Sequence, residues 1–375
     1  MNQEAYKEVL VVGGGIAGLA AAIGLRQAGC HVDLVEILPE WPRSGVGIIQ
    51  PGNALRALES LGVAQACLDA GFAYSGYSYC TADGTLLHAS SGNGPAKGLP
   101  PYNGIVRGQL LEILQNAANN AGANLRLGSS VVELAQSAEG VDVVFADGRR
   151  ARYDLVVAAE GIYSPLRDQL FRRQYQPVPT GQGVWRLTMP RPADMTQGIM
   201  MVGETSKAGF VPLSADLMYL LLVTRDVPEI HRGGGPLHLE LLERLTGFGG
   251  MVARIRESVT PTSDIVYRPL EVVRMPPPWF DRRVIFVGDA AHASTPHLGQ
   301  GAAMAIEDVV VLAQLVQSQI PASDIGAAYM ARRFPRASEI QSASIAIGEI
   351  ELGRRPDLNL LEVLTKAREF AAQPI

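Results

Sequence analysis

The first forty residues constrain the fold most, because glycines in a fixed spacing stand between two short apolar runs. A bare apolar run of β-branched character is typical of a buried parallel strand. A stretch rich in Ala and Leu and free of Pro favours a helix. The pieces occur in this order: residues 9–12 as a strand, Gly13, Gly15 and Gly18 in GxGxxG spacing, residues 19–28 as a helix and residues 31–36 as a second strand. The order predicts a βαβ unit.

The glycine spacing and the acid that follows it predict a dinucleotide site, with a purely structural βαβ unit as the alternative. Gly13 allows a tight turn, the missing Cβ of Gly15 lets a pyrophosphate approach the backbone, and Gly18 lets helix and sheet pack closely. The helix then directs free N–H groups and its positive dipole end at phosphates. Glu36 lies 18 residues after Gly18, near the roughly 20 expected for an acid that binds ribose hydroxyls. Its charge favours FAD or NAD over NADP.

Length and composition limit the class of protein. The 375 residues suffice for two domains, and 47% hydrophobic residues suit a sizeable core. A net charge of −5 without any Lys/Arg run argues against nucleic acid as the partner. Three separated cysteines without a CxxC indicate neither a disulfide framework nor a metal site. Without a long apolar run or an apolar signal core, we expect no membrane partner and a soluble, cytoplasmic protein.

The pattern changes near residue 173 and returns near residue 284, which predicts an inserted domain. In between, short strands alternate with one helix around residues 237–245, as in an antiparallel sheet. After residue 284 come a buried strand, a helix from about residue 300 to 318 and a helical tail. The predicted division is a dinucleotide-binding domain at 1–73, 102–173 and 278–375, with a substrate-binding sheet domain at 74–101 and 174–277.

A second glycine cluster, at residues 288–308, is the most specific stretch of the chain. A predicted strand ends in Gly288-Asp289, where a carboxylate can hold a ribose or polyol hydroxyl. A loop with Pro296 follows, and Gly299-Gln300-Gly301 then opens a long helix whose unpaired N–H groups can face a ligand. Such a helix end stabilises an anion by about 0.3–1 kcal/mol when exposed.

With both glycine clusters and residues 154–167 in this order, the chain resembles the single-component FAD-dependent aromatic hydroxylases, the para-hydroxybenzoate hydroxylase-like monooxygenases. The resemblance covers nearly the whole chain. It implies an α/β fold with a Rossmann-like FAD-binding domain of the glutathione-reductase type, an inserted antiparallel sheet and a helical C-terminus. It also implies that Asp289 contacts the ribityl or ribose of FAD, that residues 296–301 lie along the isoalloxazine ring and that Glu36 binds the adenosine ribose.

Arg43 and Arg107 resemble the FAD-contacting arginines of the family, although a surface or helix-capping arginine would look the same. One motif departs from the family, because Glu160 stands before Gly161 where the family has Asp. The longer side chain keeps the charge and leaves the docking of the nicotinamide donor in doubt. The residues expected at FAD are Gly13, Gly15, Ile16, Ala17, Gly18, Glu36, Arg43, Arg107, Glu160, Asp289, Pro296, Gly299, Gln300, Gly301 and Ala302.

The resemblance implies an NAD(P)H-dependent monooxygenase that hydroxylates a small phenol-, hydroxybenzoate- or hydroxypyridine-like ring. NADH or NADPH would reduce FAD transiently without a Rossmann domain of its own, and only one GxGxxG is present. Dioxygen would then add, and the flavin hydroperoxide would transfer one oxygen to the ring. The partners expected are the small aromatic substrate and O2, in a monomer or homodimer.

This chemistry requires an apolar pocket closed to water and a base for the ring hydroxyl. His297 is the first candidate base because it lies between Pro296 and Gly299, with a solvent-facing loop histidine as the alternative. Tyr219 is the second candidate, Arg186 is a candidate partner of a substrate carboxylate, and His292 is expected to anchor its loop. The expected pocket residues, each of which could equally be ordinary sheet core, are Trp185, Arg186, Met201, Phe210, Pro212, Tyr219 and His297.

Three other functions fit the same FAD domain. A flavin-dependent halogenase carries a Trp-x-Trp-x-Ile-Pro segment, whereas residues 185–190 keep only the first Trp and the Pro. An alkene reductase of the geranylgeranyl type would consume no oxygen with its substrate. A non-catalytic FAD-binding protein would show no substrate-stimulated NAD(P)H oxidation.

Overall fold

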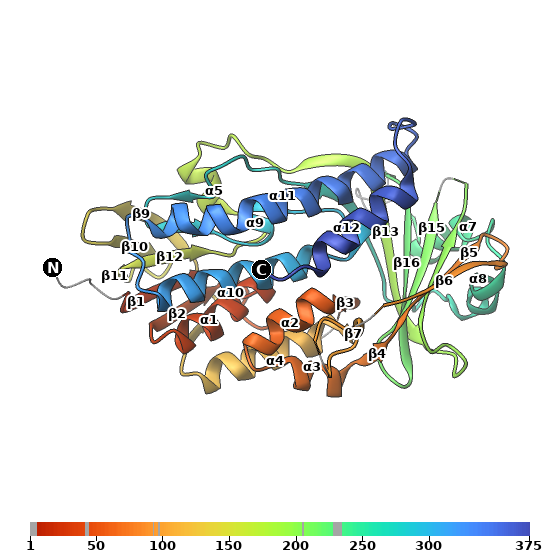
Figure 1. Cartoon of the computed structure of the whole chain (residues 1–375), viewed down its shortest axis with the longest axis horizontal. Helices are drawn as coiled ribbons and strands as arrows, with labels where there is room; N and C mark the ends of the chain where they lie inside the picture. Colours follow the sequence, from red (N-terminus) through yellow and green to blue (C-terminus); the bar gives the residue numbers. More distant parts are fainter. Residues whose placement is uncertain (1–5, 42–44, 93, 97, 205, 228–234) are drawn as a thin grey trace.

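The computed structural model describes residues 6–41, 45–92, 94–96, 98–204, 206–227 and 235–375. A six-stranded sheet forms the centre of one part of the molecule (Figure 1). Its order is β18-β19-β12-β1-β2-β8, and all neighbours are parallel except the edge strand β18. The strands are β1 (Glu8–Val12), β2 (His31–Glu36), β8 (Asn124–Leu127), β12 (Leu155–Ala158), β18 (Phe280–Asp281) and β19 (Val284–Phe286).

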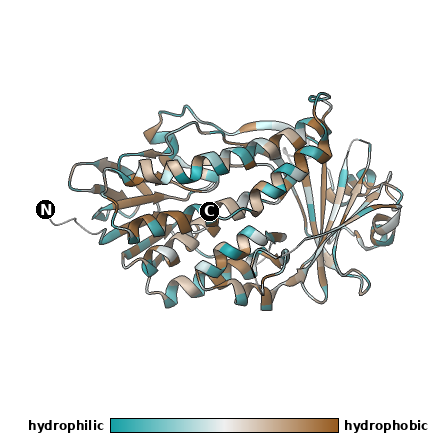
Figure 2. Cartoon of the chain, viewed as in Figure 1, coloured by the Kyte–Doolittle hydropathy of each residue, from teal (hydrophilic) through white to brown (hydrophobic). Residues whose placement is uncertain are grey.

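Helices cover this parallel sheet, and those nearest to it are the most apolar (Figure 2). Helix α1 packs between α10 and α4, while α11 runs beside α10 and α12 (Figure 1). The helices are α1 (Ile16–Gln27), α2 (Gly52–Ser60), α3 (Ala64–Ala70), α4 (Arg107–Asn120), α5 (Pro165–Leu170), α9 (Asp289–His292), α10 (Gly301–Gln317), α11 (Ile325–Glu351), α12 (Leu360–Ala372) and the 3-10 turn η2 (Pro296–Leu298).

Two three-stranded sheets flank the parallel one. The first, of order β11-β10-β9, contains β9 (Val131–Gln136), β10 (Val141–Phe145) and β11 (Arg150–Tyr153). Short turns separate β8, β9 and β10 along residues 124–145. The second sheet, of order β3-β7-β4, contains β3 (Gly47–Pro51), β4 (Phe72–Tyr74) and β7 (Tyr102–Val106).

A seven-stranded sheet of order β17-β13-β16-β15-β14-β5-β6 forms the other part of the molecule. Its strands are antiparallel except β5 and β14, which pair in parallel. Beyond it lie α7 (Leu237–Arg244), α8 (Gly250–Ile255) and the turn η1 (Arg256–Ser258) (Figure 1). The strands are β5 (Gly76–Thr81), β6 (Leu86–Ser91), β13 (Val178–Pro190), β14 (Gly198–Val202), β15 (Lys207–Pro212), β16 (Leu217–Arg225) and β17 (Ile265–Val272).

The two faces of the seven-stranded sheet have different surroundings. Because side chains alternate along a strand, neighbouring residues point to opposite faces. One face, here called the far face, packs on α7 and α8 and includes Trp185 and Phe210. The other, called the near face, carries Val184 and Tyr219 and packs toward Ile49 of β3 and Val106 of β7. The near face therefore looks toward the helix-covered parallel sheet.

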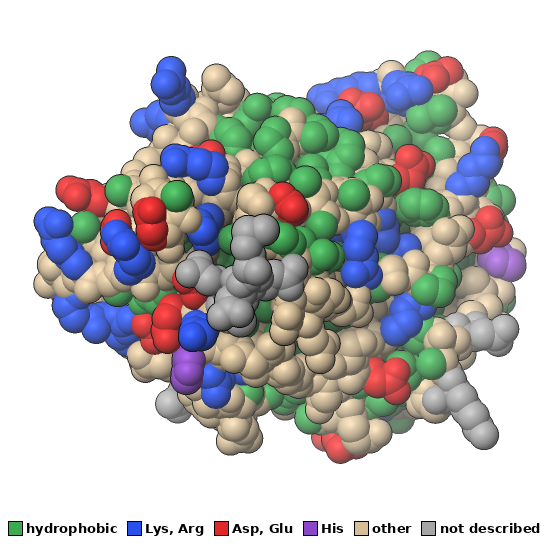
Figure 3. Space-filling view, turned by 60° about the vertical axis from the view of Figure 1, so that its left-hand side comes forward, with side chains coloured by type: hydrophobic (Ala, Val, Ile, Leu, Met, Phe, Trp, Pro, Cys, Tyr) green, Lys and Arg blue, Asp and Glu red, His purple; other side chains and the backbone are tan. Residues whose placement is uncertain are grey.

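Basic and acidic side chains are interspersed over the surface shown in Figure 3. Among the described residues, no helix combines the length and apolar character that crossing a membrane requires.

Candidate active site

The first glycine turn leaves an open position at the N-terminus of α1. Gly13 has a φ of +105°, and a Cβ on Gly18 would overlap the carbonyl oxygen of Gly13, so neither position tolerates a side chain. Gly15 caps α1 in an ordinary extended conformation, and a Cβ there would have nothing within 4 Å. Backbone packing thus requires two of the glycines, whereas Gly15 borders free space, as a pyrophosphate site needs.

Glu36 is held at the end of β2 beside this turn. Its Oε2 accepts a 2.6 Å hydrogen bond from the backbone N–H of Gly14, and its Oε1 accepts a 2.9 Å bond from Leu38. The half-buried carboxylate therefore has a fixed position next to the α1 N-terminus, where a ribose hydroxyl could reach it.

The second glycine cluster lies directly against the first. A Cβ on Gly288 would lie 3.3 Å from the Cβ of Ala17 in the first turn of α1. The N–H of Gly288 donates to Asp308 Oδ2 at 2.9 Å, and the same oxygen lies 2.6 Å from His292 Nε2. The fully buried Arg333 in turn donates to Asp308 Oδ1 at 2.8 Å. His292 and Asp308 thus hold the Gly288 turn from behind.

Asp289 is the first residue of α9 and directly follows the Gly288 turn. Its side chain is exposed, yet the surrounding protein raises the pKa of its carboxyl through desolvation, opposed by His292 and Arg107. Arg107 begins α4 with its side chain exposed, and it acts electrostatically on Asp289 and Arg186. Arg43 lies outside the described residues.

Residues 296–302 form η2 and the start of α10. Pro296 begins η2, and Gly299 adopts the left-handed conformation with its Cβ position 3.6 Å from Ile49 Cδ1. A Cβ on Gly301, the first residue of α10, would have nothing within 4 Å, and the following Ala302 is half-buried. Gln300 differs from these residues. Its buried side chain exchanges hydrogen bonds of 2.9 and 3.2 Å with Asn53, so only its backbone could serve a ligand.

Glu160 caps a helix in addition to standing at the end of β12. Its Oε2 accepts hydrogen bonds from the Ser164 hydroxyl at 2.5 Å and from the Leu166 N–H at 3.2 Å. Burial raises the pKa of this carboxyl to about 7, although both hydrogen bonds lower it. The extra methylene relative to Asp lets the carboxylate reach the first turn of α5. Gly161, with a φ of +80°, has nothing within 4 Å of its Cβ position.

These motifs meet along one edge of the parallel sheet. Strands β19, β12, β1 and β2 are neighbours, and their carboxyl ends lead to Gly288, Glu160, Gly13 and Glu36. Ligands of open parallel sheets bind outside that edge. The edge offers two helix N-termini, several positions without Cβ contacts and two carboxylates, which suits a dinucleotide with a polyol chain.

The near face of the seven-stranded sheet packs against β3. A Cβ on Gly47 would overlap the ring of Tyr219, so the missing side chain allows β3 to touch β16. Burial raises the pKa of Tyr219 to about 12, although Arg186 lowers it. Arg186 itself has its pKa lowered by burial and has Tyr219, Arg107 and Arg268 around it. Arg107 and Arg268 are therefore close enough to Arg186 to act on it electrostatically.

The structure does not bring all the predicted pocket residues together. Trp185, Met201 and Phe210 lie on the far face, at most 1% exposed, in the core formed with α7 and α8. Pro212 ends β15, and its carbonyl oxygen occupies the place that a Cβ on Gly104 of β7 would need. Only Arg186, Tyr219 and His297 of the predicted set line the side toward the parallel sheet.

His297 is buried, so the alternative of a solvent-facing loop histidine is wrong. Its side chain is 0% exposed, and its Nε2 lies 3.1 Å from Oε2 of Glu351, the last residue of α11. Lys207 donates to the other oxygen of Glu351 at 2.5 Å. Burial and the nearby Lys207 lower the pKa of His297 to about 4, so the ring is neutral at pH 7.

Sequence reasoning missed Lys207 and Glu351. Lys207 had a signal, because it is the one charged residue in the otherwise apolar strand β15. Glu351 had none, because its position depends on how the end of the long helix α11 packs against η2 and Lys207 of β15.

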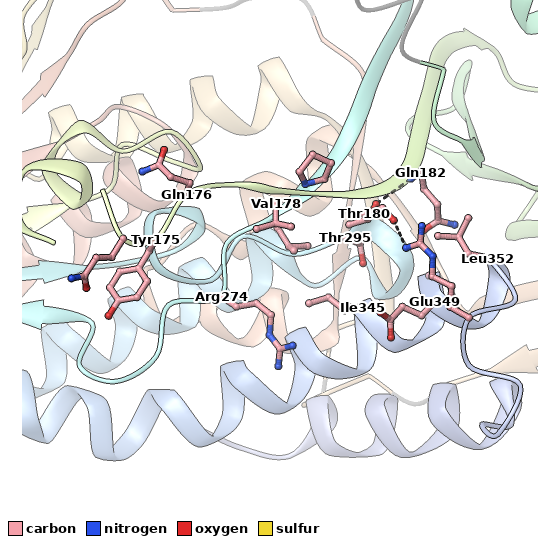
Figure 4. Close-up of a pocket in the computed structure, with 15 residues that line it drawn as sticks. Tyr175, Gln176, Val178, Thr180, Gln182, Arg274, Thr295, Ile345, Glu349 and Leu352 are labelled. Atoms are coloured by element: carbon pink, nitrogen blue, oxygen red, sulfur yellow. Dashed lines mark hydrogen bonds between the residues drawn. The ribbon is translucent and has the colours of Figure 1, made fainter. Parts of the chain in front are cut away.

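A cavity of about 350 Å³ lies between the first residues of β13 and the end of α11. Figure 4 shows Thr180 and Gln182 on its one side and Ile345, Glu349 and Leu352 on the other. Arg354 donates to the Thr180 carbonyl at 2.7 Å across it.

Comparison with known proteins identifies the family. The family described as "FAD binding domain" matches residues 6–231 and 258–344. This chain belongs to that family. FAD is therefore its cofactor, and the predicted resemblance to FAD-dependent monooxygenases is confirmed.

Three similar proteins illustrate the relationship. A putative FAD-dependent monooxygenase, YetM of Bacillus subtilis, is 34% identical over 93% of this chain and 95% of its own length. The aurachin C monooxygenase/isomerase of Stigmatella aurantiaca is 33% identical over 91% and 89%. The 2-heptyl-3-hydroxy-4(1H)-quinolone synthase of Pseudomonas aeruginosa is 34% identical over 82% and 80%.

Solved structures confirm the predicted fold class. A mutant of 2-methyl-3-hydroxypyridine-5-carboxylic acid oxygenase superposes with a TM-score of 0.82 at 25% identity, over 97% of this chain and 96% of its own. Klebsiella pneumoniae HpxO, solved with FAD and uric acid, gives a TM-score of 0.83 at 24% identity, over 97% and 93%.

Proposed function

We propose that this protein is a monooxygenase that uses FAD, NADH or NADPH, and O2 to hydroxylate a small aromatic or heteroaromatic ring carrying a hydroxyl group. One observation carries the proposal. The near face of the seven-stranded sheet, which looks toward the glycine-lined edge of the parallel sheet, is aromatic and buried yet contains the cation Arg186. Several relatives are named for quinolones or a hydroxypyridine. Nitrogen heteroaromatic rings that carry a hydroxyl or oxo substituent are therefore the first substrates to test.

FAD would lie along the edge defined by the two glycine clusters. Gly15, Ile16 and Ala17 offer the helix N-terminus to the pyrophosphate, Glu36 reaches the adenosine ribose and Asp289 reaches the ribityl chain. When bound there, FAD supplies the redox chemistry that reduction by NAD(P)H and reaction with dioxygen require. The free space beside Gly15, Gly161 and Gly301 supports this placement.

Substitution of Gly15 tests the placement without damage to the fold. Its backbone conformation suits any residue and its Cβ position is open, so Gly15→Ala should fold normally while its methyl group blocks the pyrophosphate. Gly247→Ala is the matched control, since that Cβ position is also open and lies between α7 and α8. Loss of FAD from Gly15→Ala alone supports the placement, and full FAD content in both variants would refute it.

The chain's own groups have separate roles at the near face. Tyr219 and the apolar residues around it exclude water from the reacting ring. Arg186 attracts a carboxylate or an ionised hydroxyl group of the substrate, because no acidic residue of the described chain pairs with this arginine. His297, neutral and buried, accepts the proton of the ring hydroxyl, since its Nδ1 has no hydrogen-bond partner within the described residues.

A substrate panel tests the reaction. The yellow holoenzyme is mixed with NADH or NADPH and with hydroxypyridines, 4-hydroxyquinolines, hydroxybenzoates and phenols, and nicotinamide oxidation and product mass are measured. We expect a ring of this kind to accelerate oxidation and to yield a product heavier by one oxygen atom. His297→Ala should uncouple oxidation from product formation, and equal coupling in that variant would exclude His297 as the base.

A further inference from the structure

Lys207, Glu351 and His297 form a chain of titratable side chains contributed by β15, α11 and η2. The contacts are 2.5 Å between Lys207 Nζ and Glu351 Oε1 and 3.1 Å between Glu351 Oε2 and His297 Nε2. The side chains are 13%, 20% and 0% exposed in that order. Gln182 of β13 donates from Nε2 to Glu351 Oε2 at 3.2 Å. The cluster therefore joins two strands of the near face to the loop that borders the FAD edge.

The charges in this cluster decide which nitrogen of His297 carries the proton. Burial raises the pKa of the Glu351 carboxyl, but the opposing effects of Lys207 and His297 are larger. Together they lower this pKa to about 2, so the carboxylate is ionised. A neutral imidazole that faces an ionised carboxylate donates its N–H to it. His297 therefore carries its proton on Nε2. Its Nδ1 is left as an acceptor, buried and without a partner in the described chain.

We infer that Glu351 and Lys207 are positioning residues that fix His297 in the Nε2–H tautomer and keep its Nδ1 free to accept the proton of the substrate's ring hydroxyl. The inference rests on the proposed function for its substrate. In the transfer the O–H bond breaks, the Nδ1–H bond forms, and the Glu351 carboxylate balances the charge of the imidazolium. Lys207 keeps Glu351 from taking up that proton itself.

The packing around the ring supports this role. A Cβ on Gly348, one turn before Glu351 on α11, would lie 3.0 Å from His297 Cε1, so the helix backbone rests on the imidazole. Further cations lie near the cluster: Arg368 of α12 acts on Lys207, and Arg225 of β16 donates to the Leu352 carbonyl at 3.4 Å. Glu351 is the one acid in contact with Lys207 and His297 among the described residues.

Nitrogen NMR on histidine-labelled protein reads the tautomer directly and needs no substrate. His297→Asn identifies the signals of His297. The wild-type holoenzyme should show a single Nε2–H tautomer between about pH 6 and 8. The double variant Lys207→Met/Glu351→Leu removes both charges, a replacement that folded proteins often tolerate, and should show a mixture with Nδ1–H. Lys207→Arg should retain the wild-type tautomer.

Lys366→Met/Glu362→Leu removes an exposed pair of the same type and is the control. An Nδ1–H tautomer in the wild type, or an unchanged tautomer in the Lys207/Glu351 double variant, would overturn the inference. With a substrate in hand, the double variant should lose at least about tenfold in kcat, within the roughly 10²–10⁴ that a general base contributes, with KM and FAD content retained. If no ring compound is hydroxylated even by the wild type, the proposed function fails, while the tautomer result still decides the positioning role.

Discussion

The far and near faces of the seven-stranded sheet come from the same strands, yet they differ in what they bury. The far face is a closed apolar core with α7 and α8, in which Trp185 and Phe210 are fully buried. The near face holds Arg186 close to Tyr219, and farther along the same face it holds Lys207 paired with Glu351. Burial of a charge costs free energy unless a partner compensates for it. From this contrast we propose that the far face mainly stabilises the fold and that the near face forms the substrate side of the proposed site.

Phe210→Ala should have the largest effect on stability, because it opens a cavity in the far-face core. We expect a loss of about 3–5 kcal/mol in the free energy of unfolding, measured by denaturant titration of the holoenzyme. The kcat and KM of the folded fraction should match the wild type. A changed KM at undiminished stability would mean that the far face contributes to the site.

Arg186→Met should have the opposite pattern. Loss of a charge-assisted hydrogen bond worth about 1.5–3 kcal/mol raises the KM of an anionic substrate by at least about tenfold, while the free energy of unfolding stays the same or rises. Arg254→Met is the matched control, since Arg254 pairs with Asp194 on the exposed surface of α8. An Arg186 variant that is as unstable as the Phe210 variant, with normal KM, would remove the distinction between the faces.

Acid should weaken the near face first. Burial lowers the pKa of His297 to about 4, whereas Lys207 and His297 overcome the effect of burial on Glu351 and lower its pKa to about 2. Below the ordinary pKa values of these groups, the unfolded chain therefore binds more protons than the native protein. The midpoint of thermal unfolding should therefore fall as the pH decreases from about 6.5 toward 4. His297→Asn should reduce this slope, and an identical slope in both proteins would show that His297 does not titrate as described.

Tyr219→Phe should have the smallest effect. With its pKa raised to about 12, the phenol is neutral at pH 7 and acts as a wall rather than as the base. Coupling of NAD(P)H oxidation to product should change less than about threefold, well below the contribution of a general base. A loss of about 10²-fold would instead make Tyr219 the base in place of His297.

Some of this arrangement could be predicted from the sequence. The glycine spacings and the residues around them place Gly13, Gly288 and Glu36 at strand ends, because backbone geometry restricts those positions. Alternation along β13 could also have separated Trp185 from Arg186, since adjacent residues of a strand face opposite sides. The partner of His297 could not be predicted, because Glu351 meets it through the packing of α11 on η2. The capping role of Glu160 likewise depends on where α5 begins.

The most direct test of the account is to follow labelled dioxygen into the product. The holoenzyme is supplied with NADH or NADPH, isotopically labelled O2 and a hydroxypyridine or 4-hydroxyquinoline that accelerates nicotinamide oxidation. We expect a product with one labelled oxygen on its ring for each nicotinamide oxidised. Oxidation that yields only hydrogen peroxide, or a product whose added oxygen comes from water, would contradict it.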